Sequence, residues 1–438
     1  MSEPLGIALV GCGTVGGGVA KILLEHADRL AVRAGRPLVL RRVVVKDPSK
    51  PRAVEIPKDL LATDPTAAIA DPAVHVVAEL IGGTGVARKV VLDALAAGKH
   101  VVTANKALLA ARGEELFRLA DDKGVDVYYE GAVCGGVPVI RTLREALASD
   151  RITSLHGIVN GTTNYILSAM AEKGEPLAKA LAEAQRLGYA EADPTLDVSG
   201  GDAAQKLCVL AQLAFGVRVK PEEVLTEGIL GLEPEDFAWG QKFGYALKLL
   251  AVARRVEPED GGDGAIEARV HPAFIPAGSL LAHVRGAFNA VLLRSDALGP
   301  SLLFGQGAGA MPTGSAVVSD IIDLSRNILA GSPGRVPLPP AESHIHLQPH
   351  AEIRCGYYLR FTVKDVPGVL ARIAATLAAR RISIAAVQQH EQSDEGGAVP
   401  LVIVSHRARE ADVQAAIAEV DAYNTTEAKT RLIRIESV

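Results

Sequence analysis

Cysteine and aromatic residues are scarce in this sequence. Its 438 residues include four cysteines, and no two of them form a CxxC pair. This spacing gives no sign of a zinc site or a disulfide framework and fits a reducing compartment, so we expect a cytoplasmic protein. Aromatic residues make up 4% of the chain, yet 48% is hydrophobic and 22% is charged, which is typical of a globular protein.

The sequence also lacks an excess of one charge and any long apolar run. Lys and Arg total 46 against 51 for Asp and Glu, a formal net charge of −5 without blocks of one sign. A general nucleic-acid binder needs a basic face, so we expect no nucleic-acid partner. The apolar run 247–253 is interrupted by Lys248 and is far shorter than the about 18 residues of a membrane span. With no secretion signal at the N-terminus, we expect no membrane association.

The length predicts about three domains in a chain of the α/β class. In residues 1–140, short apolar runs alternate with amphipathic stretches, which predicts a Rossmann-type, doubly wound parallel sheet. We expect an α+β substrate and dimerisation domain at 141–310, with 311–330 packing back on the first domain. Prolines make 331–350 a linker, and 351–438 has the β-α-β-β-α-β order of a ferredoxin-like domain. The strands expected in the middle domain are 152–159, 265–270, 281–284 and 290–294.

A glycine-rich turn follows the first expected strand. Residues 11–16 read Gly-Cys-Gly-Thr-Val-Gly, a GxGxxG motif, and a helix of small and apolar residues comes next. Glycines let the backbone approach a pyrophosphate, and free N–H groups at the helix N-terminus stabilise it. The motif in this setting predicts dinucleotide binding, with a plain tight turn as the alternative. The residues assigned to the nucleotide are Gly11, Gly13, Thr14, Val15 and Gly16.

The end of the second expected strand bears on the choice between NAD and NADP. A carboxylate there favours a free ribose 2′-OH, whereas a basic residue accepts a 2′-phosphate. Lys46 and Asp47 are adjacent, so both choices stay open. Lys46, with Arg41, Arg42 and Lys50 nearby, favours NADP, although a solvated loop explains any one of these residues equally well.

The densest group of reactive side chains lies in 188–206. Four carboxylates and one lysine occupy nineteen residues there. Asp202 and Lys206 stand four apart on one face of an expected helix, where they can pair, and the helix is apolar nearly all round, which predicts burial. Burial lowers a lysine pKa from about 10.4 toward the working range of a general acid. A solvated ion pair is the ordinary alternative.

Three further polar groups have two interpretations each. Lys106 begins a helix at the carboxyl edge of the first sheet, where open α/β sheets bind ligands, or it is a surface lysine. The Asn- and Thr-rich segment 156–165 lines a polar pocket or caps the helix that it begins. His344, His346 and His350 suggest a metal cluster, but an exposed connection is the preferred interpretation.

Taken together, these motifs resemble the homoserine dehydrogenase family. The run 188–206, preceded by Ala184, is similar to the family signature, and 160–165 and 104–106 resemble its other hallmarks. The resemblance covers residues 1–330 and implies reversible interconversion of L-homoserine and L-aspartate 4-semialdehyde with NAD or NADP. It also implies a place in the biosynthesis of threonine, methionine and isoleucine. Two alternatives stay open: a dehydrogenase of a related amino acid or semialdehyde, and a non-catalytic amino-acid sensor.

The resemblance implies roles for single residues. Lys206 would donate a proton to the aldehyde oxygen, Asp202 would orient it, and Lys106 would contact the nicotinamide side of the cofactor or the reacting hydroxyl. Glu191 would bind the substrate ammonium, with Asp197 as a second pocket carboxylate. The substrate set is thus Glu191, Asp197 and Asp202, and the cofactor set gains Lys46, Lys106, Gly188 and Gly307.

A monovalent cation is also implied by the resemblance. Backbone carbonyls would hold it, which suits a hard cation such as Na⁺. The matching carbonyls are those of Glu130, Val133, Gly135 and Val137. From the residues alone, this segment is only a glycine-rich turn.

The C-terminal residues 351–438 resemble an ACT domain. The resemblance rests on Asp-Val-Pro-Gly-Val-Leu at 365–370, before an expected helix whose first turn suits a proline. ACT domains usually bind amino acids at paired interfaces, which implies feedback by L-threonine and a homodimer or homotetramer. Because nothing resembling an aspartate kinase precedes residue 1, we expect a monofunctional enzyme. Deleting 351–438 is expected to leave catalysis and remove threonine sensitivity.

Overall fold

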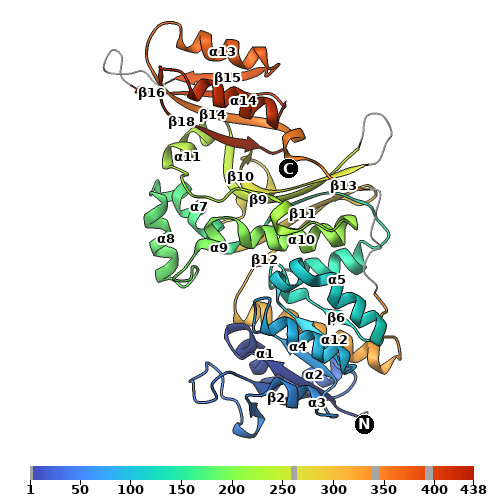
Figure 1. Ribbon diagram of the computed structural model, residues 1–438. Coiled ribbons are helices and arrows are strands. Elements are labelled where there is room, and N and C mark those ends of the chain that lie inside the picture. The colour runs from blue at the N-terminus through green and yellow to red at the C-terminus, as the bar shows by residue number, and fades with distance from the viewer. Residues whose placement is uncertain (1–2, 258–263, 337–344, 390–397) are drawn as a thin grey trace.

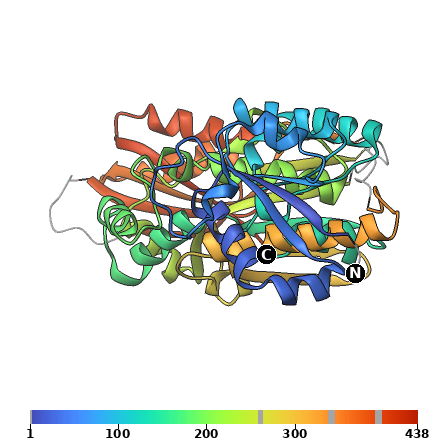
Figure 2. The ribbon, with the colours of Figure 1, turned by 90° about the horizontal axis from the view of Figure 1, so that it is seen from below.

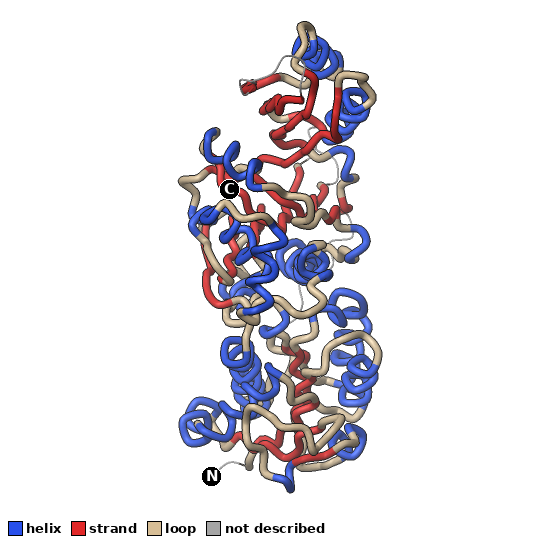
Figure 3. The backbone as a smooth tube through the Cα atoms, turned by 90° about the vertical axis from the view of Figure 1, so that its left-hand side faces the viewer, coloured by secondary structure: helices blue, strands red, loops and turns tan. Residues whose placement is uncertain are grey.

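The computed structural model describes residues 3–257, 264–336, 345–389 and 398–438. An N-terminal unit, a middle unit and a C-terminal unit follow one another along an elongated molecule (Figures 1 and 3). In the described part of the chain, no helix is long and apolar enough to cross a membrane.

The N-terminal unit is built on a parallel sheet with the strand order β3-β2-β1-β4-β5-β6. Its direction of winding reverses between β1 and β4, which is where open α/β sheets bind ligands. This order confirms the predicted doubly wound, Rossmann-type sheet. Its strands are β1 (Leu5–Val10), β2 (Leu38–Val44), β3 (Leu61–Ala62), β4 (Val76–Glu79), β5 (His100–Thr103) and β6 (Val127–Tyr128). Its helices are α1 (Thr14–Glu25), α2 (Ala27–Ala34), η1 (Lys58–Leu60), α3 (Pro65–Ala70), α4 (Val86–Ala96) and α5 (Lys106–Lys123).

A late helix, α12 (Ala310–Leu329), returns to this unit and lies beside α1 (Figure 2). The two helices approach so closely that a Cβ on Gly18 would lie 2.0 Å from the Ala310 carbonyl oxygen. Near the other end of α12, the Ser325 hydroxyl donates to the Ala34 carbonyl at 3.0 Å. The chain therefore leaves the N-terminal unit after β6 and comes back to it about 180 residues later.

The middle unit has an antiparallel sheet with the order β12-β11-β7-β9-β10. Its strands are β7 (Ile152–Ile158), β9 (Tyr245–Val256), β10 (Ala265–Pro276), β11 (Phe288–Ser295) and β12 (Gly299–Gln306), with a short β8 (Leu225–Thr226) beside β10. Its main helices are α7 (Gly161–Lys173), α8 (Leu177–Arg186), α9 (Thr195–Val198), α10 (Gly201–Phe215) and α11 (Pro234–Lys242). Short helical turns are η2 (Glu130–Ala132), α6 (Val139–Arg141), η3 (Thr142–Ala146) and η4 (Pro221–Glu223).

One predicted strand of the middle unit is wrong. The segment 281–284 lies mainly in a short helical turn, η5 (Leu280–His283), closed by a hydrogen bond from Ala282 N to Ser279 O at 3.1 Å. Leu281 and Val284 are buried in a cluster with residues of β9 to β11. Their apolar character therefore reflects packing against the sheet and not a place in it. The strands β9 and β12 were not predicted.

The C-terminal unit has the strand order β18-β14-β16-β15 with two helices, which confirms the predicted ferredoxin-like ACT fold. Its elements are β14 (Arg354–Lys364), α13 (Val369–Ala379), β15 (Ile384–Gln389), β16 (Ala398–Ser405), β17 (Ala408–Arg409), α14 (Glu410–Asp421) and β18 (Thr426–Ile435). The strand β18 also pairs in parallel with β10, so the sheets of the middle and C-terminal units are continuous. Ahead of this unit, β13 (His346–Leu347) pairs with β10 and is followed by η6 (His350–Glu352).

Candidate active site

The helix α10 carries the central ion pair of the middle unit. It begins after Gly200, whose φ of 85° is the left-handed conformation that glycine adopts without strain. Asp202 lies in its first turn and Lys206 one turn later, with 5% and 9% of their surfaces exposed. The burial predicted from the apolar helix is therefore observed.

Two lysines share the carboxylate of Asp202. Lys206 Nζ donates to Asp202 Oδ2 at 2.7 Å, and Lys106 Nζ lies 3.1 Å from Oδ1. Lys206 Nζ also donates to the carbonyl oxygen of Val159 at 2.6 Å. Because an ammonium has three N–H donors, one N–H of Lys206 has no partner among the described residues. Lys106, at the start of α5, reaches this site from the N-terminal unit.

The charges in this cluster reverse the expected direction of the Lys206 pKa. Burial by itself lowers the pKa, but the Asp202 carboxylate raises it above its ordinary value. In the same way, burial opposes ionisation of Asp202, yet the Lys206 and Lys106 ammonium groups hold its pKa well below the usual range. The prediction that burial lowers the pKa of Lys206 toward neutral pH is wrong. It left out the attraction between the buried Lys206 ammonium and the Asp202 carboxylate, which stabilises the charged lysine.

Asn160 connects this pair with a second carboxylate. Its Nδ2 donates to Asp202 Oδ2 at 2.8 Å and to Asp197 Oδ1 at 2.7 Å. Its Oδ1 accepts from Thr163 N at 2.8 Å, which caps α7. The segment 156–165 thus caps a helix and orients site carboxylates at once. Burial raises the pKa of Asp197, as does the nearby Asp202 charge, while the hydrogen bond from Asn160 opposes the rise.

Glu191 and Gly188 lie on the turn after α8. Gly188 has a φ of 79° and ends that helix. Glu191 is exposed, and its main-chain carbonyl accepts from Gln185 Nε2 at 3.1 Å. No hydrogen bond or ion pair within the described ranges joins its carboxylate to Asp197, Asp202 or the lysines. The structure therefore brings Lys106, Asn160, Asp197, Asp202 and Lys206 together and leaves Glu191 outside their contacts.

The glycine loop between β1 and α1 is shaped by close backbone approaches. Gly11 has a φ of 98°, and a Cβ there would lie 2.7 Å from the Leu80 carbonyl oxygen. A Cβ on Gly16 would lie 2.1 Å from the Gly11 carbonyl oxygen. Gly13 precedes α1 without a side-chain cap, so the first N–H groups of α1, including those of Thr14 and Val15, face no capping side chain.

A basic residue that the sequence analysis did not single out lies near this loop. Arg52 donates to the carbonyls of Pro48 and Lys50 at 3.0 and 2.8 Å. Burial raises the pKa of the Cys12 thiol in the glycine loop, and the positive charge of Arg52 opposes this rise. Lys46 is exposed just after β2, whereas Asp47 Oδ1 already accepts from Ser49 N and Oγ. From the sequence, only residues next to the end of β2 were considered. Arg52 was not included because the loop after β2 folds back, which the sequence does not show.

Most residues of the segment 130–138 are buried. Cys134 and Gly135 have φ values of 56° and 44°, and the Glu130 carboxylate accepts from the N–H groups of Ile140 and Arg141. Over the described ranges, no N–H donates to the carbonyls of Val133 and Gly135, although both residues are buried. Carbonyl oxygens that accept no hydrogen bond are available as ligands, so this segment fits a bound cation. The carbonyls of Glu130 and Val137 flank these two in the chain.

The late glycine loop lies directly against this segment. A Cβ on Gly135 would lie 2.6 Å from the Gly307 carbonyl oxygen, and Gly136 N donates to the Gln306 carbonyl at 3.0 Å. Gly307 in turn packs against the Asn289 side chain, leaving no room for a Cβ. The loop predicted to approach the cofactor therefore adjoins the segment predicted to hold the cation.

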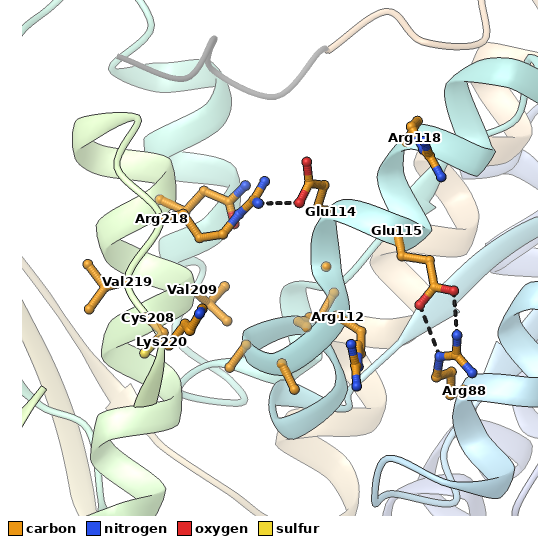
Figure 4. Close-up of a pocket in the computed structure, with 15 residues that line it drawn as sticks. Arg88, Arg112, Glu114, Glu115, Arg118, Cys208, Val209, Arg218, Val219 and Lys220 are labelled. Carbon is orange, nitrogen blue, oxygen red and sulfur yellow. Dashed lines mark hydrogen bonds and ion pairs between the residues drawn. The ribbon is translucent and has the colours of Figure 1, made fainter. Parts of the chain in front are cut away.

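A separate hollow of about 440 Å³ lies between later turns of α5 and α10 (Figure 4). At this hollow, Arg88 and Glu115 form a bidentate ion pair, and Arg218 forms an ion pair with Glu114. None of the predicted site residues lines this hollow. It is distinct from the cluster around Asp202. The linker histidines form no side-chain metal site where the structure describes them, and His344 lies outside the described residues.

Comparison with known proteins agrees with this arrangement. Family models described as homoserine dehydrogenase, homoserine dehydrogenase NAD binding domain and ACT domain match residues 138–322, 11–130 and 357–423. A homoserine dehydrogenase of Neisseria gonorrhoeae is 45% identical over 441 residues, covering 100% of this chain and 99% of that one. One from Pseudomonas aeruginosa is 44% identical, with 100% of both chains covered. The chain belongs to the homoserine dehydrogenase family.

Solved homoserine dehydrogenases have the same fold. The crystal structure of the Thiobacillus denitrificans protein matches with a TM-score of 0.92 at 45% identity and 99% coverage of both chains. A structure from S. aureus matches with a TM-score of 0.77 at 30% identity and full coverage of both chains. The chain is therefore an NAD(P)-dependent oxidoreductase acting on a CH–OH group, and the predicted family, activity, nicotinamide cofactor and ACT domain are confirmed.

Proposed function

We propose that Lys206 is the proton donor when L-aspartate 4-semialdehyde is reduced to L-homoserine. The observation that carries this assignment is that, beside its bonds to Asp202 and Val159, one N–H of Lys206 has no partner among the described residues. Asp202 keeps the ammonium charged in a buried place, so a proton is available for the alkoxide that develops on the aldehyde oxygen. The nicotinamide ring, when bound, supplies or accepts the hydride.

Asp202 and Lys106 act around this proton donor. Asp202 orients Lys206 through the 2.7 Å hydrogen bond, and Lys106, 3.1 Å from the other carboxylate oxygen, adds a positive charge on the side of the nucleotide unit. Asp197, whose Oδ1 accepts from Asn160 Nδ2, would bind the substrate ammonium. Glu191 would join it only by a movement of its exposed turn.

The nucleotide would lie on the glycine loop at Gly11, Gly13 and Gly16. The free N–H groups at the start of α1 suit its pyrophosphate. Lys46, exposed after β2, and Arg52, close to Cys12, would give a 2′-phosphate two cationic partners. This charge supports a preference for NADP over NAD.

A monovalent cation is the next part of the proposal. Na⁺ would be held by the carbonyls of Glu130, Val133, Gly135 and Val137, beside the Gly307 loop at the cofactor.

The C-terminal unit would bind a regulator. The ACT fold supports L-threonine as a feedback effector. We also propose a homodimer or homotetramer and a place in threonine, methionine and isoleucine biosynthesis.

The pH dependence of Asp202→Asn tests the proton donor. In the oxidation of L-homoserine, Lys206 must be neutral to accept the hydroxyl proton, so the rate rises with pH through its pKa. Removing the Asp202 charge removes what raises that pKa, while burial and Lys106 continue to oppose the charged form. The rising limb of the kcat/KM profile should therefore move to lower pH. Asp193→Asn is the control: the Asp193 carboxylate is exposed and accepts from Thr195 N, so its substitution should leave the profile in place. An unmoved limb in Asp202→Asn would contradict the assignment.

A further inference from the structure

The last strand of the C-terminal unit enters the sheet of the middle unit. Arg434 on β18 pairs with Ala273 on β10, and Glu436 N donates to the Phe274 carbonyl at 2.8 Å. Two arginines at this junction, Arg269 and Arg434, have 0% and 1% of their surfaces exposed. Buried arginines need anionic partners, and their partners show which segments they connect.

Arg434 binds one carboxylate from each unit. Its Nη1 and Nη2 donate to the two carboxylate oxygens of Glu227 at 2.8 and 2.9 Å, and Glu227 follows β8 in the middle unit. Its Nε and Nη2 donate to Glu410, the first residue of α14, at 2.9 and 2.6 Å. The Arg434 guanidinium thus makes a bidentate contact with a carboxylate of each unit, and these contacts fix the orientation of the guanidinium.

The segment that carries Glu227 packs against the turn between α9 and α10. Ile229 N donates to the Val198 carbonyl at 2.9 Å. A Cβ on Gly228 would lie 2.0 Å from that same carbonyl oxygen, and one on Gly200 would lie 3.3 Å from the Glu227 carbonyl oxygen. The main chain of 227–229 is thus in direct contact with the main chain of 198–200. A shift of the first segment therefore has to shift the second as well.

We infer that Glu227 is a positioning residue for the substrate site, held in place by Arg434 of the ACT unit. The turn 198–200 lies between Asp197 and Asp202 in the chain, and Asn160 binds both carboxylates, so the placement of this turn affects their spacing. The state of the C-terminal unit reaches the segment 227–229 through the Arg434 guanidinium, and Arg431 adds a contact to the nearby Gly231 carbonyl. This inference rests on the proposed roles of Asp197 and Asp202.

The same junction offers a matched control. Arg360 on β14 donates to Glu233 at 2.6 Å and also to Glu235 and Asp236, all at the start of α11. The side chain of Glu233 is 57% exposed and that of Glu227 is 41% exposed. Both bind an arginine of the C-terminal unit whose side chain is 10% exposed or less. Of the two segments, the one at Glu227 is bonded to the turn 198–200.

Steady-state kinetics of Glu227→Gln, Glu227→Asp and Glu233→Gln in the full chain test the inference. We expect Glu227→Gln to raise the KM for L-homoserine about fivefold, a size typical of coupling from outside a site, and to leave the KM for the nucleotide unchanged. Glu227→Asp keeps the charge and should restore part of the wild-type KM, and Glu233→Gln should match the wild type. A purely structural ion pair would lower the amount of active enzyme, counted by nucleotide binding, and would not move KM.

Asp197→Asn separates this inference from the proposed function. If Asp197→Asn raises the KM for L-homoserine while Glu227→Gln keeps the wild-type KM, the positioning role of Glu227 is overturned and the site assignment stands. If Asp197→Asn leaves KM unchanged, the assignment of the substrate carboxylate fails first. A raised KM in both variants supports both.

Discussion

Two buried lysines differ in protonation because their neighbours differ. Lys206 and Lys248 are both nearly buried lysines, yet the pKa of Lys206 rises beside Asp202 while that of Lys248 falls to about 8. Burial is the main cause at Lys248, and the nearby Arg285 charge adds to it. Lys248 has a carbonyl and an amide as partners, Val284 O at 2.5 Å and Asn164 Oδ1 at 3.4 Å. Only one of the two lysines is therefore held charged by an anion.

Lys248→Met should stabilise the protein at neutral pH. In the folded state Lys248 loses its proton near pH 8, whereas the unfolded chain keeps it to about pH 10.4. Stability therefore rises with pH between these values, and below pH 8 the cost is constant at about 3 kcal/mol. Since the variant also loses two hydrogen bonds, we expect a net gain of about 1–2 kcal/mol at pH 7 that shrinks toward pH 10. Urea unfolding at both pH values measures it, with Lys429→Met, an exposed strand lysine, as control. An equal gain at both pH values would contradict the titration argument.

The composition of the site was only partly predictable from single residues. The i, i+4 spacing of Asp202 and Lys206 predicted their pairing, and the apolar helix predicted their burial. Asn160 joins the cluster from 42 positions away, which no local pattern can show. The Lys206 pKa was predicted in the wrong direction because the strength of a buried pair depends on a distance that the sequence does not contain.

Among the elements, the contact between α1 and α12 is built on glycine. Gly18→Ala would place a Cβ 2.0 Å from the Ala310 carbonyl, so the helices must separate. Overpacking of this kind costs about 1–3 kcal/mol, and we expect a lower thermal midpoint and weaker nucleotide binding. Gly17→Ala is the control: a Cβ there meets nothing within 4 Å, so it should be neutral or stabilising. Equal midpoints for the two variants would show that the close approach does not constrain the helices.

Whole elements were predicted where periodicity and context agreed. The doubly wound order of the N-terminal sheet and the buried helix α10 follow their patterns, whereas the two-residue strand β3 was not predicted. The strand β9 was missed because it is apolar on successive positions and contains a buried lysine, so it lacks alternation. The segment 281–284 has the composition of a strand but covers a sheet face. Burial pattern alone does not distinguish these cases.

For the whole molecule, the C-terminal unit is part of the same sheet and core as the middle unit. The ring of Tyr358 packs edge-on against Phe274 at 5.1 Å between centroids, and Ile433 belongs to the large central core. Phe274 lies on β10, and Glu436 follows β18 on the other side of the contact between these strands. Glu436 also binds Arg269 of β10. The structure therefore argues against the expectation that residues 351–438 can be removed without loss of catalysis.

Deleting residues 351–438 should destabilise the remaining chain. The deletion exposes Phe274 and uncovers an edge of β10, which favours aggregation. We expect the thermal midpoint to fall by at least about 5 °C and the soluble fraction to decrease. Differential scanning calorimetry and size-exclusion chromatography measure both. A truncated chain with the wild-type midpoint would show that the shared sheet contributes little.

The most direct test of this account is the oxidation of L-homoserine by Lys206→Met, followed by nicotinamide absorbance with NAD and NADP in parallel. Loss of a positioned acid–base group predicts a kcat lower by about 10²–10⁴, while nucleotide dissociation constants stay within about twofold of the wild type. Retention of most of the wild-type rate, in a variant that binds nucleotide normally, would contradict the role of Lys206.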